Sequence, residues 1–174
     1  MLVNAPLSIE TAKELRKWSE EISDRVMNDL LKAVLARVKK IDRDHDIPYA
    51  AGCSRNGETV FIDRHMPRSF AHEGKRVRTH RFLILHETVE KALLDELVLH
   101  NLHARRIALR AERAAVGAAG LSWSRYNAFT QENVEKIQDE RLTDVPSDLD
   151  LTPYRDEKDV EKLKQLAAAE TPKG

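Results

Sequence analysis

The chain has 174 residues, which is long enough for one domain with a buried core. Its 29 lysines and arginines equal its 29 aspartates and glutamates, so the net charge is zero and gives no general case for nucleic-acid or membrane binding. Aromatic residues make up 5% of the chain, a low share that favours aliphatic helix packing over an all-β sandwich. The sole cysteine, Cys53, excludes an internal disulfide and is typical of a reducing compartment.

The apolar runs of the chain are short. None approaches the roughly 20 residues of a membrane helix, and the N-terminus lacks the charged and apolar regions of a signal peptide. We therefore expect a cytoplasmic protein with no membrane partner.

The first predicted element is a long helix over residues 8–42. Ser8 is a suitable N-cap, and Ser23-Asp24 could interrupt the helix once. Apolar residues recur along it at steps of three and four: Ile9, Ala12, Leu15, Trp18, Ile22, Val26, Leu30, Val34, Val38 and Ile41. This pattern indicates a scaffold helix or a helical hairpin with one face toward a core.

A β-hairpin is predicted near residues 49–64, after a polar connection. Asn56-Gly57 separates two short apolar segments, and this dipeptide suits a type I′ turn, in which both central residues have positive φ. The second strand runs from Thr59 to Arg64 and ends before Pro67. A lone two-stranded ribbon is marginally stable in water, so we expect this one to pack on the helices.

Residues 66–79 are predicted to form a loop, because Pro67 and Gly74 interrupt them. The stretch from Lys75 to Arg81 is basic and could contact phosphates. The zero net charge and the lack of interleaved aromatic residues favour a solvated loop instead. Nucleic acid is therefore not an expected partner.

Helices are expected to fill the next part of the chain, because no glycine or proline occurs from Val77 to Val116. Asn101 is the expected break, which divides the segment into helices over about 80–98 and 102–118. Thr79 is a plausible N-cap for the first of them. Gly117 and Gly120 are expected to end the second helix.

A further helix is expected to begin after Ser122 or Ser124 and to carry Trp123, Tyr126, Phe129, Val134 and Ile137. A loop over residues 144–152 follows, and Pro153 opens a short charged helix that ends near Ala169. Residues 1–150 are thus predicted to form a single helical domain, with a short helix and a flexible tail over residues 151–174. The predicted fold class is α+β, mainly α with one small β-hairpin.

The segment Leu85-His86-Glu87-Thr88-Val89-Glu90 is the part of the chain that indicates chemistry. On a helix, His86 and Glu90 share one face and could reach a common metal ion. Glu87 is rotated by about a quarter-turn from His86. That is the place of the general base in the helical His-Glu-x-x-His zinc motif. The apolar residues before His86 tend to draw it inward, and a buried charge must be paired or bind a metal.

A third metal ligand has to come from elsewhere, because a zinc hydrolase needs three protein ligands, an open position for water and a carboxylate base. Glu112 lies 22 residues beyond Glu90, a separation that lets an antiparallel helix return a carboxylate to the first helix. His100 and His103 are alternatives near the turn between the helices. His103 and Glu112 are nine residues apart, about half a turn out of phase, so they are not expected to be ligands together.

The order of helix, β-hairpin, motif helix and following helix is similar to the minimal plan of the zincin-like metallopeptidases. The chain also resembles small bacterial and phage-type proteins that have His-Glu-x-x-Glu in place of His-Glu-x-x-His. This resemblance covers roughly residues 49–118. It implies a metal site of His86, Glu90 and Glu112 with Glu87 as general base, zinc as the cofactor and a peptide or protein as the substrate.

Two positions depart from the family pattern. Glu90 stands where zincins have histidine, and the harder donor favours iron or manganese over zinc. In such relatives a histidine often lies seven residues before the downstream glutamate, but Arg105 occupies that position here. An arginine in the site would pair with Glu112 or Glu90 and could replace the metal cation.

Two functions are the main interpretations of these residues, and a third, weaker one is a nucleic-acid-associated protein that uses Lys75 to Arg81 with Arg105, Arg106 and Arg110. The first is a metal-dependent, peptidase-like hydrolase in which a metal-activated water attacks a peptide or amide carbonyl, with Glu87 as general base. The substrate would pair with an edge strand, Thr59–Asp63, and His65 could steady an oxyanion, although a solvated strand end is the simpler interpretation of His65. The second is a non-catalytic helical interaction or scaffold protein of phage or mobile-element type with a degenerate site.

Overall fold

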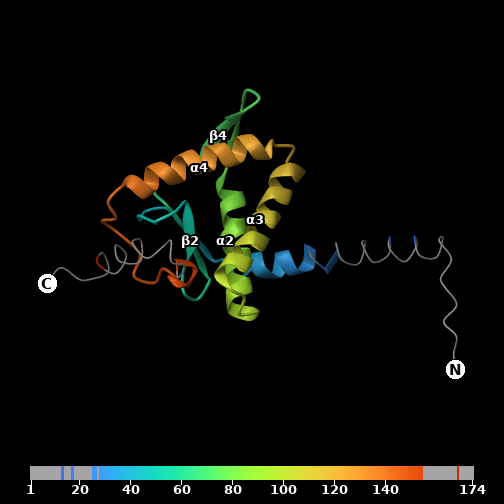
Figure 1. The fold of residues 1–174 in the computed structure, drawn as a ribbon, viewed down its shortest axis with the longest axis horizontal. Coiled ribbons are helices and arrows are strands. Elements are labelled where there is room, and N and C mark those ends of the chain that lie inside the picture. The colour runs from blue at the N-terminus through green and yellow to red at the C-terminus, as the bar shows by residue number, and fades with distance from the viewer. Residues whose placement is uncertain (1–12, 14–16, 18–24, 27, 155–167, 169–174) are drawn as a thin grey trace.

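The computed structural model describes residues 13, 17, 25, 26, 28–154 and 168. Within them the fold is mixed α+β, as predicted, and its main helices are α2 (His80–Glu96), α3 (Asn101–Ala118) and α4 (Trp123–Asp139). Helices α2 and α3 pack along each other, and α4 crosses them near one end (Figure 1). None of the helices in the described residues combines the length and the hydropathy that spanning a membrane requires.

The predicted hairpin near residues 49–64 is confirmed and belongs to a three-stranded sheet. Strand β2 (Ala51–Cys53) pairs antiparallel with β3 (Thr59–Ile62), and Gly57 in the connecting turn has φ of 72°. Strand β1 (Lys40–Asp42) pairs parallel with the other edge of β3, so the strand order is β1-β3-β2. The sheet packs on α2 through Val60, Ile62 and Leu83, which belong to one buried cluster.

The predicted helix over residues 8–42 is wrong at its C-terminal end. Residues 28–35 are helical, but Lys40–Asp42 form β1. The N–H groups of Lys39 and Lys40 donate to the carbonyl of Glu58, so hydrogen bonds to the hairpin replace those of another helical turn. Spacing of apolar residues cannot reveal a partner strand that lies so far along the chain. Ser8 and Ser23-Asp24 lie outside the described residues.

The predicted loop over residues 66–79 is also wrong, because it forms a second β-hairpin. Strand β4 (Ser69–His72) pairs antiparallel with β5 (Lys75–Arg78), and both turn residues, Glu73 and Gly74, have positive φ. A Glu-Gly turn is a weaker hairpin signal than Asn-Gly, and three of the four β5 residues are exposed cations. The sequence therefore lacks the alternation that would have indicated a strand.

The segment Thr59–Asp63 is not an edge strand, which corrects the expectation from the zincin resemblance. Strand β3 lies between β1 and β2, and both of its sides are engaged in ladder hydrogen bonds. A substrate therefore cannot extend the sheet at β3. Strand β2 is the outer strand on the side that faces α2 and the pocket described below.

The predicted break between the two central helices is confirmed. Helix α2 ends at Glu96 and α3 begins at Asn101, with the His100 imidazole accepting the N–H of Leu102 as an N-cap. A row of residues four apart on α3, mostly small, is buried against α2 and lets the helix axes approach closely: Ala104, Ala108, Glu112 and Val116. Glu112 is the one charged member of this row.

The ends of the helices follow the predicted capping residues in part. Thr79 precedes α2, but its hydroxyl donates to the carbonyl of Pro67 and caps no helical N–H. Gly120, at φ of 72°, ends α3 in a Schellman-type turn in which the N–H of Leu121 donates to Val116. Ser122 caps α4 by accepting the N–H of Arg125.

The last described segment returns to the sheet. Ser54 and Leu149 form an isolated antiparallel bridge, and the N–H of Asp150 donates to the carbonyl of Cys53. A single 3-10 turn, η1 (Thr152–Tyr154), follows. The predicted charged helix beyond it and the tail lie outside the described residues, apart from residue 168, which is helical.

Candidate metal site

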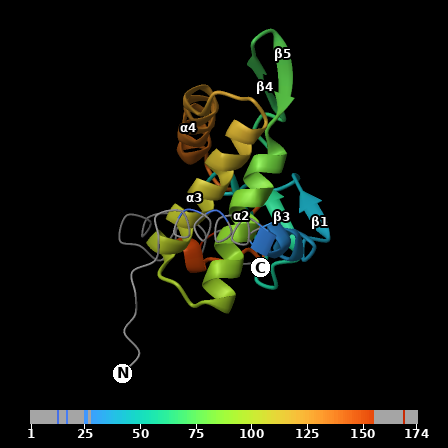
Figure 2. The same cartoon turned by 90° about the vertical axis from the view of Figure 1, so that its right-hand side faces the viewer.

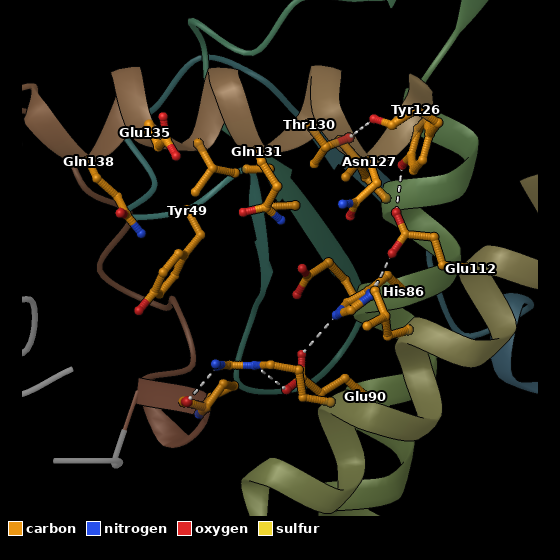
Figure 3. Close-up of a pocket in the computed structure, with 18 of the residues that line it drawn as sticks. Tyr49, His86, Glu90, Glu112, Tyr126, Asn127, Thr130, Gln131, Glu135 and Gln138 are labelled. Carbon is orange, nitrogen blue, oxygen red and sulfur yellow. Dashed lines mark hydrogen bonds and ion pairs between the residues drawn. The ribbon is translucent and has the colours of Figure 1, made fainter. Parts of the chain in front are cut away.

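A pocket of about 470 Å³ lies where α2, α3 and α4 meet the start of β2 (Figure 3). Its wall on the sheet side is formed by Tyr49, Ala50 and Ala51. The charged residues of the motif also line the pocket, together with Arg105 and Glu112. The two central helices therefore deliver the predicted chemistry to one cavity.

His86 stands between two buried acids in this pocket, and its side chain is 15% exposed. Its Nδ1 donates to Oε2 of Glu112 over 2.9 Å, while its Nε2 lies 3.5 Å from Oε2 of Glu90 (Figure 3). The i, i+4 spacing on α2 thus brings His86 and Glu90 together, as predicted. The helix pairing adds Glu112 from α3.

Glu112 is held from two sides. Its Oε2 accepts from His86, and its Oε1 accepts the hydroxyl of Tyr126 on α4 over 2.5 Å. It therefore contacts the ring nitrogen of His86 that is directed away from Glu90. A carboxylate in this position fixes the orientation of a metal-binding histidine, a role distinct from that of a ligand.

Glu90 is 4% exposed and only partly satisfied. Its Oε1 is buried and accepts no hydrogen bond, although Nε of Arg105 lies 3.5 Å away as an ion pair. Arg105 also donates to the carbonyl of Pro153 over 3.0 Å and lies 5.8 Å from the centre of the Tyr49 ring. Arg105 therefore pairs with one of the two acids named for it from the sequence, and it does so at the rim of the pocket.

Glu87 lines the same pocket and carries a perturbed carboxyl group. Burial raises its pKa to about 7, against the opposing charges of His86 and Arg105. Burial would lower the pKa of His86, but its hydrogen bonds with Glu112 and Glu90 outweigh burial and raise it to about 10. At neutral pH the pocket thus holds a charged imidazole beside a carboxyl group whose pKa is raised by burial.

His65 and His103 lie elsewhere. His65 is exposed after β3, where its Nδ1 pairs with Glu140 over 2.6 Å, and it does not line the pocket. His103 is exposed on α3, with its ring packed edge-on against His100. The helical phase argument that separated His103 from Glu112 agrees with this placement, and the exposure of His65 agrees with the simpler interpretation of it as a solvated strand end.

Tyr126 is the site residue that sequence reasoning missed. It was assigned to the apolar face of the helix after Ser122, and it does pack there, against Phe70 and Phe82. Its hydroxyl nevertheless donates to Glu112. A buried tyrosine usually needs a partner for its hydroxyl, so the available signal was the presence of a tyrosine in an apolar stripe.

A second group of possible ligands lies in the loops beside the sheet. Asp46, Asp63 and His65 each offer an atom within 4.8 Å of the others, as do His86, Glu87 and Glu90 in the pocket. Asp46 accepts two N–H groups and one hydroxyl from Thr143 and Asp144 and pairs with Arg64 over 2.7 Å. Its oxygens are therefore already used to join two loops.

Comparison with protein-family models, with curated proteins and with solved structures finds no match. The similarity to zincin-like metallopeptidases therefore stays a prediction based on the His-Glu-x-x-Glu motif and on the spacing to Glu112.

Proposed function

We propose that the chain is a metal-dependent hydrolase of peptide or amide bonds, with its reaction centre at His86, Glu87 and Glu90. The observation that supports this proposal most strongly is the orientation of His86. Glu112 holds Nδ1, which leaves Nε2 beside the acids of the same helix. The Oε1 of Glu90 is buried and accepts no hydrogen bond, and a bound cation would satisfy such an oxygen by coordinating it.

The donor set suits a borderline or hard divalent metal. One imidazole nitrogen and carboxylate oxygens are ligands for zinc, iron or manganese. His86 and Glu90 would supply two of the three protein ligands expected from the sequence, and Glu112 would orient His86 instead of being the third. Arg105 would have to withdraw from Glu90. When bound, the metal would polarise the substrate carbonyl and make a water more acidic. Because His86 is protonated in the metal-free pocket, binding should release a proton.

Glu87 would move the proton in hydrolysis. Its pKa of about 7 lets the carboxylate accept a proton from the attacking water at neutral pH and return it to the leaving nitrogen as the carbon–nitrogen bond breaks. The new bond joins the water oxygen to the carbonyl carbon. The substrate would lie against Tyr49, Ala50 and Ala51, since β2 and not β3 borders the pocket.

A second candidate function is a non-catalytic helical scaffold with a degenerate site. The ion pair between Arg105 and Glu90 favours it, because charged His86 and Arg105 can balance Glu90 and Glu112 without a metal. Such a network satisfies the requirement that buried charges be paired. Arg105 is therefore the residue on which the two functions differ.

Metal binding by the purified, chelator-stripped protein separates the two candidates. Calorimetry and elemental analysis with Mn²⁺, Fe²⁺ and Zn²⁺ should find one equivalent in the unmodified protein and in His65→Ala, a histidine control from the other acidic group. His86→Ala and Glu90→Ala should find none. Glu112→Gln should weaken binding about 10- to 100-fold, as expected of an orienting carboxylate. Glu87→Gln should keep the metal and lose peptide hydrolysis.

If the unmodified protein binds none of the added metals, the hydrolase proposal is excluded and the scaffold proposal remains. Arg105→His then tests the degenerate site directly, because it removes a competing cation and adds an imidazole beside Glu90. Metal binding gained by Arg105→His would show that the geometry is a metal site disabled by one arginine. No gain would show that the pocket is not built for a metal.

A further inference from the structure

The β4–β5 hairpin projects away from the helices. Figure 2 shows it extending beyond the ends of α2 and α4, with its turn at the far end. The pairs of its ladder run from Ser69 with Arg78 to His72 with Lys75. No residue of this ribbon lines the pocket, and neither proposed function uses it.

One face of the ribbon anchors it to the body of the protein. Phe70 and Val77 are cross-strand partners, and both pack in the cluster around Tyr126. Phe70 stacks on Phe129 with ring centres 5.2 Å apart. His72 is buried and accepts the N–H of Ser122 on its Nε2 over 3.1 Å. These contacts give the ribbon a fixed orientation.

The opposite face is basic. Side chains alternate along a strand, so Arg76 and Arg78 share the face that is directed away from Phe70. Their cross-strand partners are Ala71 and Ser69, which are too small to cover the guanidinium groups. Further exposed cations lie on the ribbon and at its base: Arg68, Lys75 and Arg81.

These five cations have no carboxylate partner among the described residues. Glu73, at the turn, is the one acid between Arg68 and Arg81. Some exposed cations elsewhere are paired with acids, as Lys39 is with Glu58 and Lys136 with Glu132, whereas others in the described chain, such as Arg106 and Arg110, are not. What distinguishes the ribbon is that five such cations, unpaired within the described chain, lie within 14 residues. The zero net charge of the chain therefore hides a local excess of positive charge.

His80, at the base of the ribbon, reports the same excess. Burial lowers its pKa, and four nearby arginines lower it further: Arg78, Arg43, Arg68 and Arg81. Charges that were neutralised by neighbouring acids would not act together in this way. This lowered pKa agrees with the placement of the exposed arginines, which make the potential around the base of the ribbon positive.

We propose that this basic ribbon is a DNA-binding arm, which contacts the phosphates of double-stranded DNA from the major groove. A two-stranded ribbon fits the roughly 12 Å major groove of B-form DNA, whereas the major groove of A-form RNA is too narrow. Four of the five cations are arginines, whose planar guanidinium groups bind phosphate oxygens in pairs.

The other anionic partners fit less well. Single-stranded nucleic acid is bound by stacking on exposed aromatic rings, but Phe70, the aromatic residue of the ribbon strands, is 6% exposed. Insertion into an anionic membrane needs exposed apolar side chains, and the large exposed apolar residues of the described chain all lie outside residues 66–81. The ribbon offers charge without either of these.

Fluorescence anisotropy with a labelled duplex of about 20 base pairs tests the proposal. The double variant Arg76→Gln/Arg78→Gln removes two exposed charges from the ribbon face, and Arg106→Gln/Arg110→Gln removes two exposed arginines from α3 as the matched control. At each salt concentration between 50 and 200 mM, the ribbon variant should have a Kd at least about tenfold above that of the unmodified protein. Its slope of log K against log salt should be smaller by about 2. The α3 variant should change neither.

Circular dichroism should show both variants folded, since all four side chains are exposed. Equal duplex affinity and salt slope for the ribbon variant and the unmodified protein would overturn the proposal, as would the absence of duplex binding at low salt. Stronger binding to single-stranded DNA, to an RNA duplex, or to vesicles of equal parts phosphatidylcholine and phosphatidylserine would also overturn it. These outcomes do not depend on whether the pocket binds a metal.

Discussion

Two acidic groups in this protein look alike on distance alone and differ in how their oxygens are used. The loop cluster (Asp46, Asp63, His65) and the pocket cluster (His86, Glu87, Glu90) each gather three possible ligand atoms within 4.8 Å. The loop cluster joins segments next to the sheet, whereas the pocket cluster lies on one helix beside a cavity.

In the loop cluster, backbone N–H groups occupy the carboxylates. Asp63 accepts the N–H of Ile47 and that of His65, each over 2.8 Å, and Asp46 accepts those of Thr143 and Asp144. Burial would raise the pKa of Asp46, but these bonds and Arg64 lower it below its usual range. These acids hold the loops together through hydrogen bonds, and a metal could bind them only by displacing those bonds.

In the pocket cluster, no hydrogen bond from a backbone N–H to the carboxylates of Glu87 or Glu90 is found among the described residues. Among the described residues, Glu90 forms ion pairs with His86 and Arg105, each over 3.5 Å, and its Oε1 accepts no hydrogen bond. The difference teaches that closeness of acids does not identify a metal site. Unused lone pairs that border a cavity are the more informative feature.

The largest expected effect is on the loop cluster. Asp63→Ala would leave the buried N–H of Ile47 without an acceptor, and we expect the free energy of unfolding to fall by about 3 kcal/mol. Urea denaturation followed by circular dichroism measures it, with Asp44→Ala as an exposed aspartate control. A loss as small as that of the control would show that Asp63 does not fasten the loop.

A smaller decrease in the free energy of unfolding is expected from Tyr126→Phe. It removes a buried hydroxyl that donates to a charged carboxylate over 2.5 Å, a bond worth about 2 kcal/mol, while keeping the ring packed. The same denaturation experiment measures this loss. Thr88→Val is a suitable control, because the buried hydroxyl of Thr88 donates to the Ile84 carbonyl of its own helix, α2. Unchanged stability in Tyr126→Phe would mean that Glu112 is not held from α4.

The pocket cluster should also make the metal-free protein less stable as pH rises. His86 has a pKa of about 10 when folded, against an ordinary value of 6.5, so the folded state keeps a proton that the unfolded state loses. Its contribution is complete below pH 6.5 and disappears as the pH passes through 10. Within this window stability should fall by at most about 1.4 kcal/mol per pH unit.

Denaturation in the presence of chelator, with His86→Gln as the reference, isolates this contribution. Glu87, whose pKa is raised from 4.5 to about 7, acts in the same direction at lower pH, so the comparison is best made between about pH 7.5 and 9.5. Parallel pH profiles for the two proteins would show that His86 is not paired with Glu90 and Glu112 in solution.

The smallest effect is expected at the surface of the loop cluster. His65 and Glu140 are 2.6 Å apart, but their side chains are 48% and 46% exposed. Glu140→Gln should therefore change the free energy of unfolding by no more than about 0.5 kcal/mol. A change near that of Asp63→Ala would require a structural role for His65 that its exposure does not suggest.

The sequence predicted the central helices and the first hairpin well, because their signals are local. Asn56-Gly57 gave the turn, and the long segment without glycine or proline gave α2 and α3. Strand β1 was missed because β3, its partner among the described strands, is remote in sequence. Strands β4 and β5 were missed because cations face solvent where apolar residues usually mark a strand.

The sequence could predict which residues form the candidate site, but not which of their atoms are in contact. Spacing alone placed His86, Glu90 and Glu112 together, because helix geometry and helix pairing have fixed periods. It could not show that Glu112 binds the far nitrogen of His86, or that Tyr126 from a third helix holds it. Those contacts depend on side-chain torsions and on the crossing of α4, which sequence periodicity does not encode.

The segment after the isolated bridge, residues 150–154, is joined to α2 and α3 by side-chain contacts. Buried Lys91 pairs with Asp150 over 2.8 Å, Asn101 donates to the carbonyl of Thr152, and Arg105 donates to that of Pro153. The guanidinium group next to Glu90 is therefore tethered to the far end of the described chain. A protein shortened before Asp150 would change the charge balance of the pocket without altering any residue that lines it from α2.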